Sequence, residues 1–415
     1  MSVAWTEEQQ KVIDLRKRNI LVSAAAGSGK TAVLVERIIA MLTDAEDPVS
    51  VDSLLIVTFT EAAAAEMKER IRDAIEKKIS EDGENEHLKT QATLIHSAQI
   101  TTIHSFCLSV IRDHFHAIDI DPGFRVAEEG ELKLMKHDVL GQVLEDNYEE
   151  GGEAFQEFVE AYGSGRDDRK IEELVLKLYE YSRSYPDPGG WLQSCVDAYD
   201  IKNVEELERS TYMELIRRQI KLYMEDAESL TEEALGVCME PDGPSVYEEA
   251  LLADSGIVQS FLAAKSYEEL YEASGRIKWT KLKANRDKTV SEEKAALVKA
   301  ARDEVKKTVN DVAAQYFYQA PDGVLEDMAL CKKAMAVLAS LVDQFAARFE
   351  EQKRTQNMID FSDMEQYALQ ILAVKEGDSF APTAVAGEYQ QRFREIMIDE
   401  YQDSNLIQET ILTSV

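Results

Sequence analysis

A glycine-rich stretch near the N-terminus sets the first limit on the fold. Residues 24–31 read AAAGSGKT and stand between an apolar run, Asn19–Ser23, and an amphipathic pattern that begins at Thr31. This order predicts a strand, a loop and a helix. The stretch fits the phosphate-binding pattern G-x-x-x-x-G-K-[ST] except at its first position, where Ala24 replaces glycine. Because the backbone N–H groups of such a loop and the dipole of the following helix face an anion, the sequence predicts a phosphate site in an α/β fold.

The loop also offers side chains for a bound nucleotide. Lys30 is expected to reach the β- and γ-phosphates, and the hydroxyl of Thr31 is expected to ligate Mg²⁺. A glycine-rich turn in an ordinary α/β protein is the alternative interpretation. The residues expected to line the nucleotide are Ala24, Ala25, Ala26, Gly27, Ser28, Gly29, Lys30 and Thr31.

An acidic pair follows a second apolar run near the C-terminus. The run Glu395–Ile398 predicts a short strand, and Asp399 and Glu400 come directly after it. Ligands of open α/β folds bind where parallel strands end, so the two carboxylates are expected at that edge. There Asp399 would hold Mg²⁺, Glu400 would orient and deprotonate the attacking water, and Gln402 would sense the γ-phosphate. Alone, an acidic pair is most simply part of a solvated surface; joined to Lys30, it supplies the second half of phosphoryl-transfer chemistry.

The expected secondary structure of the chain changes twice along its length. Further strands are expected at 54–59 and 99–103, each followed by a helix, which predicts a parallel sheet with crossover helices. Two of these helices show one apolar face, formed by Leu34, Ile38, Met41 and Leu42 and by Met67, Ile71, Ile75 and Ile79. From about 120 to 355, long helical patterns are broken only at Pro186–Gly190, Pro241–Pro244 and Pro321–Gly323. We therefore predict an α/β domain formed by 1–119 and 356–415, interrupted by an all-helical insertion at 120–355.

The charge balance bears on possible partners. With 46 basic and 79 acidic residues, the net charge of −33 argues against a polyanionic partner, although a narrow basic track would be enough for one. The strongest basic cluster contains Arg276, Lys278, Lys281, Lys283, Arg286 and Lys288 around Trp279. It is interpreted either as a contact with duplex DNA or as a solvated helix face or loop. The chain lacks a leader-like N-terminus and any long apolar run, and its four cysteines lack a CxxC spacing, so we expect a soluble cytoplasmic protein with reduced thiols.

Four motifs in order resemble a known family. The stretches AAAGSGKT (24–31), VTFTEAAAAEM (57–67), TTIHSF (101–106) and IDEYQD (398–403) resemble motifs I, Ia, Ib and II of the UvrD/Rep group of superfamily 1 DNA helicases. The upstream sequence WTEEQQ resembles the Q motif of that group. Within it, IDFSDM (359–364) and the large helical insertion are most similar to AddA, the helicase/nuclease component of AddAB (RexAB) complexes.

The resemblance implies a RecA-like P-loop NTPase domain that uses ATP and Mg²⁺ to translocate on single-stranded DNA. It implies double-strand break repair, duplex ends as substrates, a nuclease domain elsewhere in the full-length protein and an AddB-like partner subunit. Gln9 would bond the adenine edge, and the residues that match DNA contacts are Thr58, Phe59, Thr60, Thr102 and His104. Glu61 and Ala62 depart from the Asn-Lys of the group's pattern, which puts one expected phosphate or DNA contact in doubt.

Three classes of function compete on the sequence. The first is the front half of a DNA-translocating ATPase, with a UvrD-like repair helicase without nuclease as its close variant. The second is a P-loop switch or an enzyme acting on a small molecule. The third is a nucleotide-binding scaffold that docks partners without acting on DNA. Because Val415 follows the acidic pair so closely, we expect this chain to be part of a longer protein. We also expect these residues alone to hydrolyse ATP poorly, because the arginine that stabilises the transition state would come from a second domain.

Overall fold

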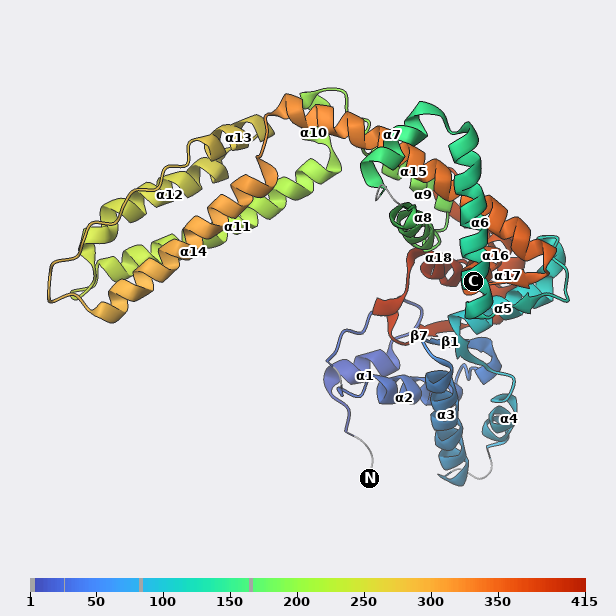
Figure 1. Ribbon diagram of the computed structural model, residues 1–415. Helices are drawn as coiled ribbons and strands as arrows, with labels where there is room; N and C mark the ends of the chain where they lie inside the picture. The colour runs from blue at the N-terminus through green and yellow to red at the C-terminus, as the bar shows by residue number, and fades with distance from the viewer. Residues whose placement is uncertain (1–3, 26, 82–84, 164–166) are drawn as a thin grey trace. The chain divides into compact units, whose positions relative to one another are not determined.

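The computed structural model describes residues 4–25, 27–81, 85–163 and 167–415. They form two compact units (Figure 1). Unit 1 comprises Met1–Leu192 and Leu338–Val415, and unit 2 comprises Gln193–Val337. This division falls inside the helical stretch 120–355, since 120–192 and 338–355 belong to the unit that also holds the α/β part. The motif-based segments 1–119, 120–355 and 356–415 remain a prediction.

A three-stranded parallel sheet lies at the centre of unit 1. Strand β1 (Leu54–Thr58) pairs with β2 (Gln99–Thr102) on one side and with β7 (Glu395–Ile398) on the other. The register sets Thr58 beside Thr102 and Val57 beside Ile398. The carboxyl ends of all three strands therefore share one edge of the sheet.

Alternate residues of β1 face two different apolar cores. Leu55 and Val57 pack in a core with helices α5 (Ile103–His114), α16 (Phe361–Leu372) and α18 (Leu406–Ser414). Leu54 and Ile56 pack in a second core with α2 (Lys30–Leu42) and α3 (Glu61–Glu81). Because a strand alternates its side chains between the two faces, β1 is buried along its whole length. Figure 1 shows α2 and α3 on one side of β1 and α5 and α16 on the other.

The sequence-based predictions for this sheet are largely confirmed. The parallel pairing is as expected, β7 has the predicted bounds, and the predicted strands at 54–59 and 99–103 end at Thr58 and Thr102. The predicted apolar faces are also confirmed, with Ile38, Met41 and Leu42 buried on α2 and with Met67, Ile71 and Ile75 buried on α3.

The predicted strand at Asn19–Ser23 is wrong. This segment is not assigned to a strand, and no backbone hydrogen bond joins it to another described strand. Leu21 is 79% exposed and Val22 is 43% exposed. A strand of a parallel sheet is normally buried on both faces and gains its stability from the ladder, so an apolar run of this length without a pairing partner stays outside the sheet.

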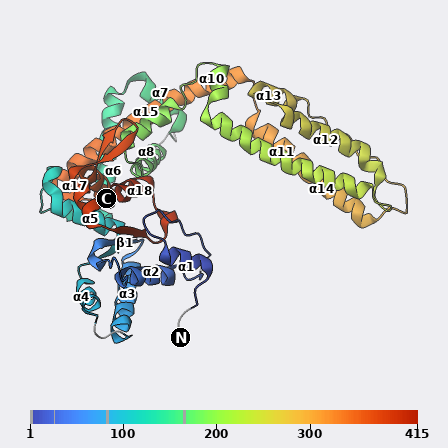
Figure 2. The ribbon, with the colours of Figure 1, turned by 180° about the vertical axis from the view of Figure 1, so that it is seen from behind.

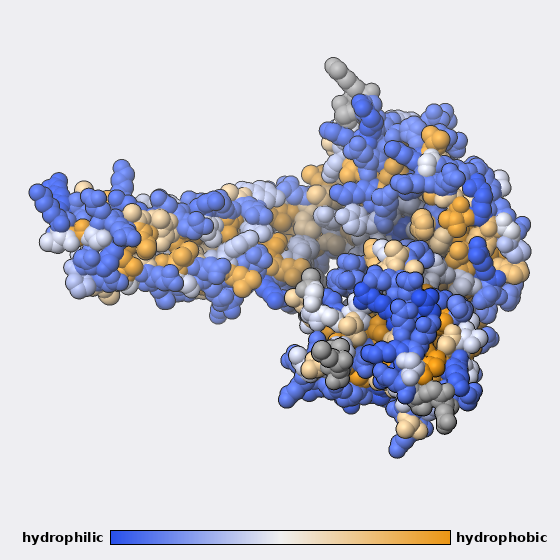
Figure 3. Space-filling view, turned by 90° about the horizontal axis from the view of Figure 1, so that it is seen from below, coloured by the Kyte–Doolittle hydropathy of each residue, from blue (hydrophilic) through white to orange (hydrophobic). Residues whose placement is uncertain are grey.

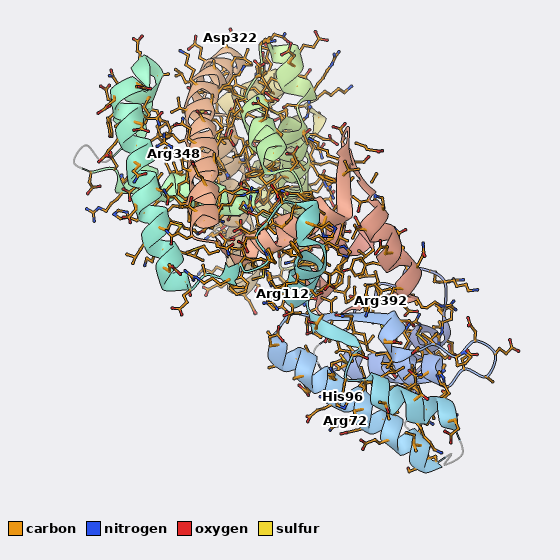
Figure 4. All side chains as sticks on the ribbon, turned by 90° about the vertical axis from the view of Figure 1, so that its right-hand side faces the viewer. Arg72, His96, Arg112, Asp322, Arg348 and Arg392 are labelled. Atoms are coloured by element: carbon orange, nitrogen blue, oxygen red, sulfur yellow. The ribbon has the colours of Figure 1, made fainter. Side chains whose placement is uncertain are left out.

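The other elements of unit 1 surround these cores. Strand β3 (Arg125–Val126) pairs in parallel with β4 (Met358–Ile359), and β5 (Ala373–Glu376) forms an antiparallel hairpin with β6 (Ser379–Pro382). Asp146 of α6 (Glu129–Glu150) pairs at 2.5 Å with Arg348 of α15 (Pro321–Thr355), which is labelled in Figure 4. The remaining helices are α1 (Glu7–Asp14), α4 (Glu86–Leu94), α6 (Glu129–Glu150), α7 (Gly152–Tyr162) and α8 (Arg169–Ser182), followed by α17 (Ala384–Arg392) and the 3-10 turns Val51–Ser53, Phe115–Ala117 and Tyr401–Asp403. Helices α9 (Pro188–Asp197) and α15 (Pro321–Thr355) have residues in both units.

Unit 2 is helical in its described residues. It contains α10 (Val204–Arg209), α11 (Thr211–Cys238), α12 (Glu248–Ala263), α13 (Tyr267–Gly275), α14 (Glu292–Tyr316) and the 3-10 turn Ser245–Tyr247. Long helices α11, α12 and α14 lie side by side (Figure 2), and Ile220, Met224, Val305 and Val309 form part of their shared core. Arg302 of α14 makes a buried ion pair with Asp254 of α12 at 2.5 Å. In Figure 3 the surface of these helices is mainly hydrophilic, with separate apolar patches.

The proline breaks predicted in the helical region coincide with helix ends. Pro188 begins α9, Pro321 begins α15, and Pro241–Pro244 lies between α11 and the 3-10 turn at Ser245. Proline is tolerated in the first helical turn because its missing N–H has no intrahelical partner there. Among the described residues, no helix is both long enough and apolar enough to cross a membrane.

Candidate functional site

The glycine-rich loop is exposed and leads directly into α2. Gly27 and Gly29 have φ values of 77° and 83°, in the left-handed region that glycine adopts without strain. Gly29 is the N-cap of α2, and no side chain of the described residues caps the helix, which leaves the N–H groups of its first turn available to an anion. The ammonium of Lys30 donates to the carbonyl of Ala24 at 3.0 Å. Ala26, one of the residues predicted to bind nucleotide, lies outside the described residues.

Helix α1 is hydrogen-bonded to this loop through the side chain of Gln9. The amide Nε2 of Gln9 donates to the carbonyl of Ser28 at 3.2 Å, and its Oε1 accepts from the backbone N–H of Thr6 at 3.0 Å. The hydroxyl of Thr6 in turn accepts from the N–H of Gln9, which completes a capping box at the start of α1. The structure therefore brings Gln9 together with the loop, as part of one local hydrogen-bonded arrangement.

An ion pair joins α2 to the sheet. Arg37 contacts Glu395, the first residue of β7, through Nε–Oε1 at 2.5 Å and Nη2–Oε2 at 2.9 Å. At the end of α2, the carbonyl of Met41 accepts from the N–H of Val49, shortly before β1 begins. Both contacts involve the C-terminal half of α2, which therefore lies near the start of β7 and near the segment that leads into β1. Lys30 lies seven residues before Arg37, about 10 Å away along the helix axis, and Asp399 lies four residues after Glu395, about 13 Å away along β7.

The acidic pair occupies a strained turn at that edge. The backbone N–H of Asp399 donates to Val57 of β1 at 2.9 Å, so the residue is the continuation of β7. Glu400 has φ 55° and ψ 43°, a left-handed conformation that is uncommon outside glycine and that clusters at functional sites. The amide Nε2 of Gln402 donates to the Glu400 carboxylate. Among the described residues, no hydrogen bond joins the loop 24–31 to Asp399 or Glu400.

A second group of predicted residues lies beyond β1. The hydroxyl of Thr58 is buried and donates to the carbonyl of Thr60 at 3.1 Å, while the Thr60 hydroxyl accepts from the N–H of Ala63. The ring of Phe59 is 60% exposed, so Phe59 is not a core residue beneath α3. Of these three predicted DNA contacts, Phe59 offers the largest free surface.

Glu61 binds the hydroxyls of the neighbouring predicted segment. Its Oε1 accepts from Thr102 Oγ1 at 2.9 Å and from Ser105 Oγ at 2.6 Å. The hydrogen bond from Ser105 and then that from Thr102 lower the pKa of Glu61, so the carboxylate stays ionised at neutral pH. Glu61 therefore places a negative charge at the position where the chain departs from the family's motif and where the sequence left a phosphate or DNA contact in doubt.

A cavity of about 320 Å³ in unit 1 is lined by Phe59, Glu61, Thr102 and Ser105, whereas Thr58 and Thr60 are not among its lining residues. His104 lies in it with its ring edge-on to Phe361, at 5.3 Å between ring centroids and 74° between ring planes. The described lining residues are Phe59, Glu61, Thr102, His104, Ser105, Leu108, Val126, Phe361 and Met364. Exposed aromatic rings, hydroxyls and an imidazole in one hollow can bind a nucleobase and its backbone.

Sequence reasoning missed several polar residues at the site. Arg37, Ser105 and Glu365 form contacts between elements that lie far apart in the chain, and Glu61, noted in the sequence only as a departure from the motif, does the same. Glu365 is 5% exposed, which a glutamate in the middle of a helix does not predict. The local signal of its burial is that Ala368 and Leu369, three and four residues later on the same face of α16, are apolar.

The predicted basic cluster lies in unit 2 and is partly neutralised. Arg276 pairs with Glu272 at 2.6 Å, and Lys283 pairs with Glu249. Lys278, Lys281 and Arg286 are exposed and make no ion pair among the described residues. The cluster follows α13 and lies outside any helix apart from Arg276 at its cap, so the helix-face interpretation is wrong and a basic loop remains.

Comparison with known proteins gives a consistent relationship. Residues 5–415 match the family model described as UvrD/REP helicase N-terminal domain. The chain is 48% identical over 417 residues to the A-subunit of the ATP-dependent helicase/nuclease from Lachnoclostridium phytofermentans, covering 99% of this chain and 30% of that protein. It is 41% identical to the protein of the same name from Clostridium perfringens strain SM101, covering 100% of this chain and 33% of the relative, and 40% identical to the one from Bacillus velezensis, covering 99% and 33%. The chain thus spans about a third of the length of these relatives, and it belongs to the UvrD/REP helicase N-terminal domain family.

Proposed function

We propose that this chain is the ATP-binding part of a DNA helicase, the AddA component of a helicase/nuclease complex, in which unit 1 contains a RecA-like P-loop domain. One observation carries the proposal: the Arg37–Glu395 ion pair joins α2, the helix that begins at the glycine-rich loop, to β7, the strand that ends at the acidic pair. Phosphoryl transfer needs a phosphate-binding loop and metal-binding carboxylates together, and these two segments supply them.

The residues fit a magnesium–nucleotide complex by their chemistry. Lys30 and the free N–H groups at the start of α2 would hold the phosphates, and Gln9, which bonds Ser28, would hold the adenine edge. Thr31 and Asp399 offer the oxygen ligands that Mg²⁺ prefers. Glu400 would accept a proton from the attacking water, with its carboxylate oriented by Gln402. The nucleotide would supply the phosphoryl group, and these residues would bind it, orient the water and take up its proton.

The cavity in unit 1 supports single-stranded DNA as the strand along which the proposed helicase moves. Phe59 is exposed for stacking, and His104 and Thr102, which line the cavity, would meet the backbone, with Thr60 exposed beside them and the buried Thr58 supporting the segment. From the resemblance of the motifs, we propose that the whole protein acts on duplex ends in double-strand break repair in the cytoplasm. A nuclease activity and an AddB-like partner subunit complete the proposal, and 120–355 is the helical insertion of the motor.

A switch or a scaffold that does not act on DNA is the competing function. The measurement that separates them is the ATP hydrolysis rate of the whole protein with and without a single-stranded oligonucleotide. We expect DNA to raise the rate, and Lys30→Ala and Asp399→Asn to abolish it without a change in melting temperature. Lys77→Ala, an exposed lysine on α3, is the matched control and is expected to behave as the unmodified protein. A Lys30→Ala protein that still unwinds DNA would defeat the proposal.

A further inference from the structure

The carboxylate of Glu365 is buried at the meeting point of three helices. Glu365 lies on α16 and is 5% exposed. Its Oε1 accepts from Nε2 of Gln408 on α18 at 2.6 Å, and Nε2 of His104 on α5 lies 3.2 Å from the same oxygen. Its Oε2 lies 3.5 Å from Nδ2 of Asn405. A buried carboxylate is costly unless its oxygens are bonded, so these partners hold the group in one position.

On one side, Glu365 is bonded to the segment that follows the acidic pair. Asn405 is the N-cap of α18, and it forms a capping box with Gln408 in which each side chain bonds the backbone N–H of the other. The 3-10 turn Tyr401–Asp403 separates this cap from Glu400. A short, hydrogen-bonded stretch therefore joins the acidic turn to the two amides that hold Glu365.

On the other side, Glu365 holds a residue of the cavity. His104 is in the first turn of α5, which begins directly after Thr102, and its ring also contacts Phe361. Among the described residues, no basic side chain other than His104 forms an ion pair with Glu365. The orientation of the imidazole in the cavity is thus set by a carboxylate that is itself held by the cap of α18.

We infer that Glu365 is a positioning residue that couples the cavity segment at His104 to the acidic turn at Glu400 through the cap of α18. The inference rests on the proposed function, because it assigns DNA to the cavity and ATP to the acidic turn. It adds that the two sites communicate through one buried carboxylate. The mechanism is local: DNA that moves His104 changes a hydrogen bond of Glu365, and the cap of α18 responds.

The experiment measures the ATPase of the whole protein, in complex with its partner, while oligo(dT) is added. Glu365→Gln keeps the side-chain volume but removes the charge and one acceptor. We expect the oligo(dT) concentration for half-maximal stimulation to rise about tenfold, the size expected for losing one hydrogen bond to a charged group, and the fold-stimulation to fall. The rate and KM for ATP without DNA are expected to stay within about twofold.

Gln408→Leu tests the same path from α18 and carries the test alone if Glu365→Gln fails to fold. Because both residues act in one path, the double variant Glu365→Gln/Gln408→Leu is expected to be no worse than the worse single variant, whereas independent structural defects would add. Glu388→Gln, which removes an exposed carboxylate on α17, is the matched control and is expected to leave stimulation unchanged.

The outcomes separate the inference from the function on which it rests. A protein without substitutions that DNA does not stimulate overturns the proposed function and the coupling together. If DNA stimulates that protein but the folded Glu365→Gln variant responds at the same oligo(dT) concentration and to the same extent, the coupling alone is overturned. Additive losses in the double variant overturn it as well.

Discussion

Arg37 of α2 and Glu395 of β7 form a two-pronged ion pair although 358 positions separate them in the chain. The guanidinium also donates to the carbonyl of Val12 at the end of α1. One arginine therefore joins the helix that follows the glycine-rich loop, the strand that precedes the acidic pair and the helix that carries Gln9. Bidentate arginine–carboxylate contacts fix geometry as well as adding energy, so this residue sets how the two halves of the proposed ATP site meet.

Arg37→Met is predicted to destabilise the protein and to weaken nucleotide binding. Removing one partner of a buried pair costs roughly 3–5 kcal/mol, and the side chain of Glu395 is 21% exposed, so we expect about 2 kcal/mol. Urea unfolding and the Kd for ATP would measure the two effects. Arg70→Met is the control, because the Arg70–Glu66 pair is on the surface and is worth at most about 0.5 kcal/mol. Equal unfolding midpoints for the two variants would show that Arg37 has no such role.

Glu61→Gln is predicted to tighten binding of single-stranded DNA. The ionised carboxylate holds the hydroxyls of Thr102 and Ser105 and repels any phosphate that approaches them. Losing one like charge at contact distance in water is worth about 1 kcal/mol, which corresponds to about fivefold in affinity. Fluorescence anisotropy with labelled oligo(dT) would measure it, with Glu66→Gln on the same helix as the control. Weaker binding by Glu61→Gln would mean that the carboxylate supports the DNA site instead of competing with it.

Phe59→Ala is predicted to weaken DNA binding with little loss of stability. The ring is 60% exposed, so its removal leaves no core cavity and is expected to change stability by less than about 0.5 kcal/mol. Stacking of one base on an aromatic ring is worth about 1–3 kcal/mol, so the Kd for oligo(dT) is expected to rise about tenfold. Phe59→Trp should restore affinity. Tyr181→Ala, an exposed aromatic of α8, serves as the control, and an equal Kd for both alanine variants would contradict a stacking role.

The spacing of apolar residues predicted those helices and strands whose formation depends mainly on residues close together in the chain. The apolar faces of α2 and α3 follow from residues three and four apart, and β7 follows from a short apolar run before Asp399. The same rule failed at Asn19–Ser23, where the apolar run is present but no strand pairs with it. Strand formation depends on a partner elsewhere in the chain, and a sequence window does not contain that partner.

The missed polar residues share this dependence on distant partners. Glu61 acquires its role from Thr102 and Ser105, which follow it by 41 and 44 positions. Glu365 is buried because Gln408 and His104 lie on other helices and bond its carboxylate. A polar residue within a helix is expected on the surface until its partners are known, so these contacts could be found only in three dimensions.

Replacing Lys278, Lys281 and Arg286 with alanine is predicted to reduce the salt dependence of duplex DNA binding. These three side chains are exposed and unpaired among the described residues, while Ile277, Trp279 and Leu282 pack the same segment against unit 2. Each phosphate interaction that is removed should flatten the plot of log K against log salt by about 0.9, because fewer counterions are released on binding. Lys283 is left unchanged because Glu249 already pairs with it, and Lys221→Ala on α11 is the control. A triple variant whose salt slope equals that of the control would show that the basic segment does not contact DNA.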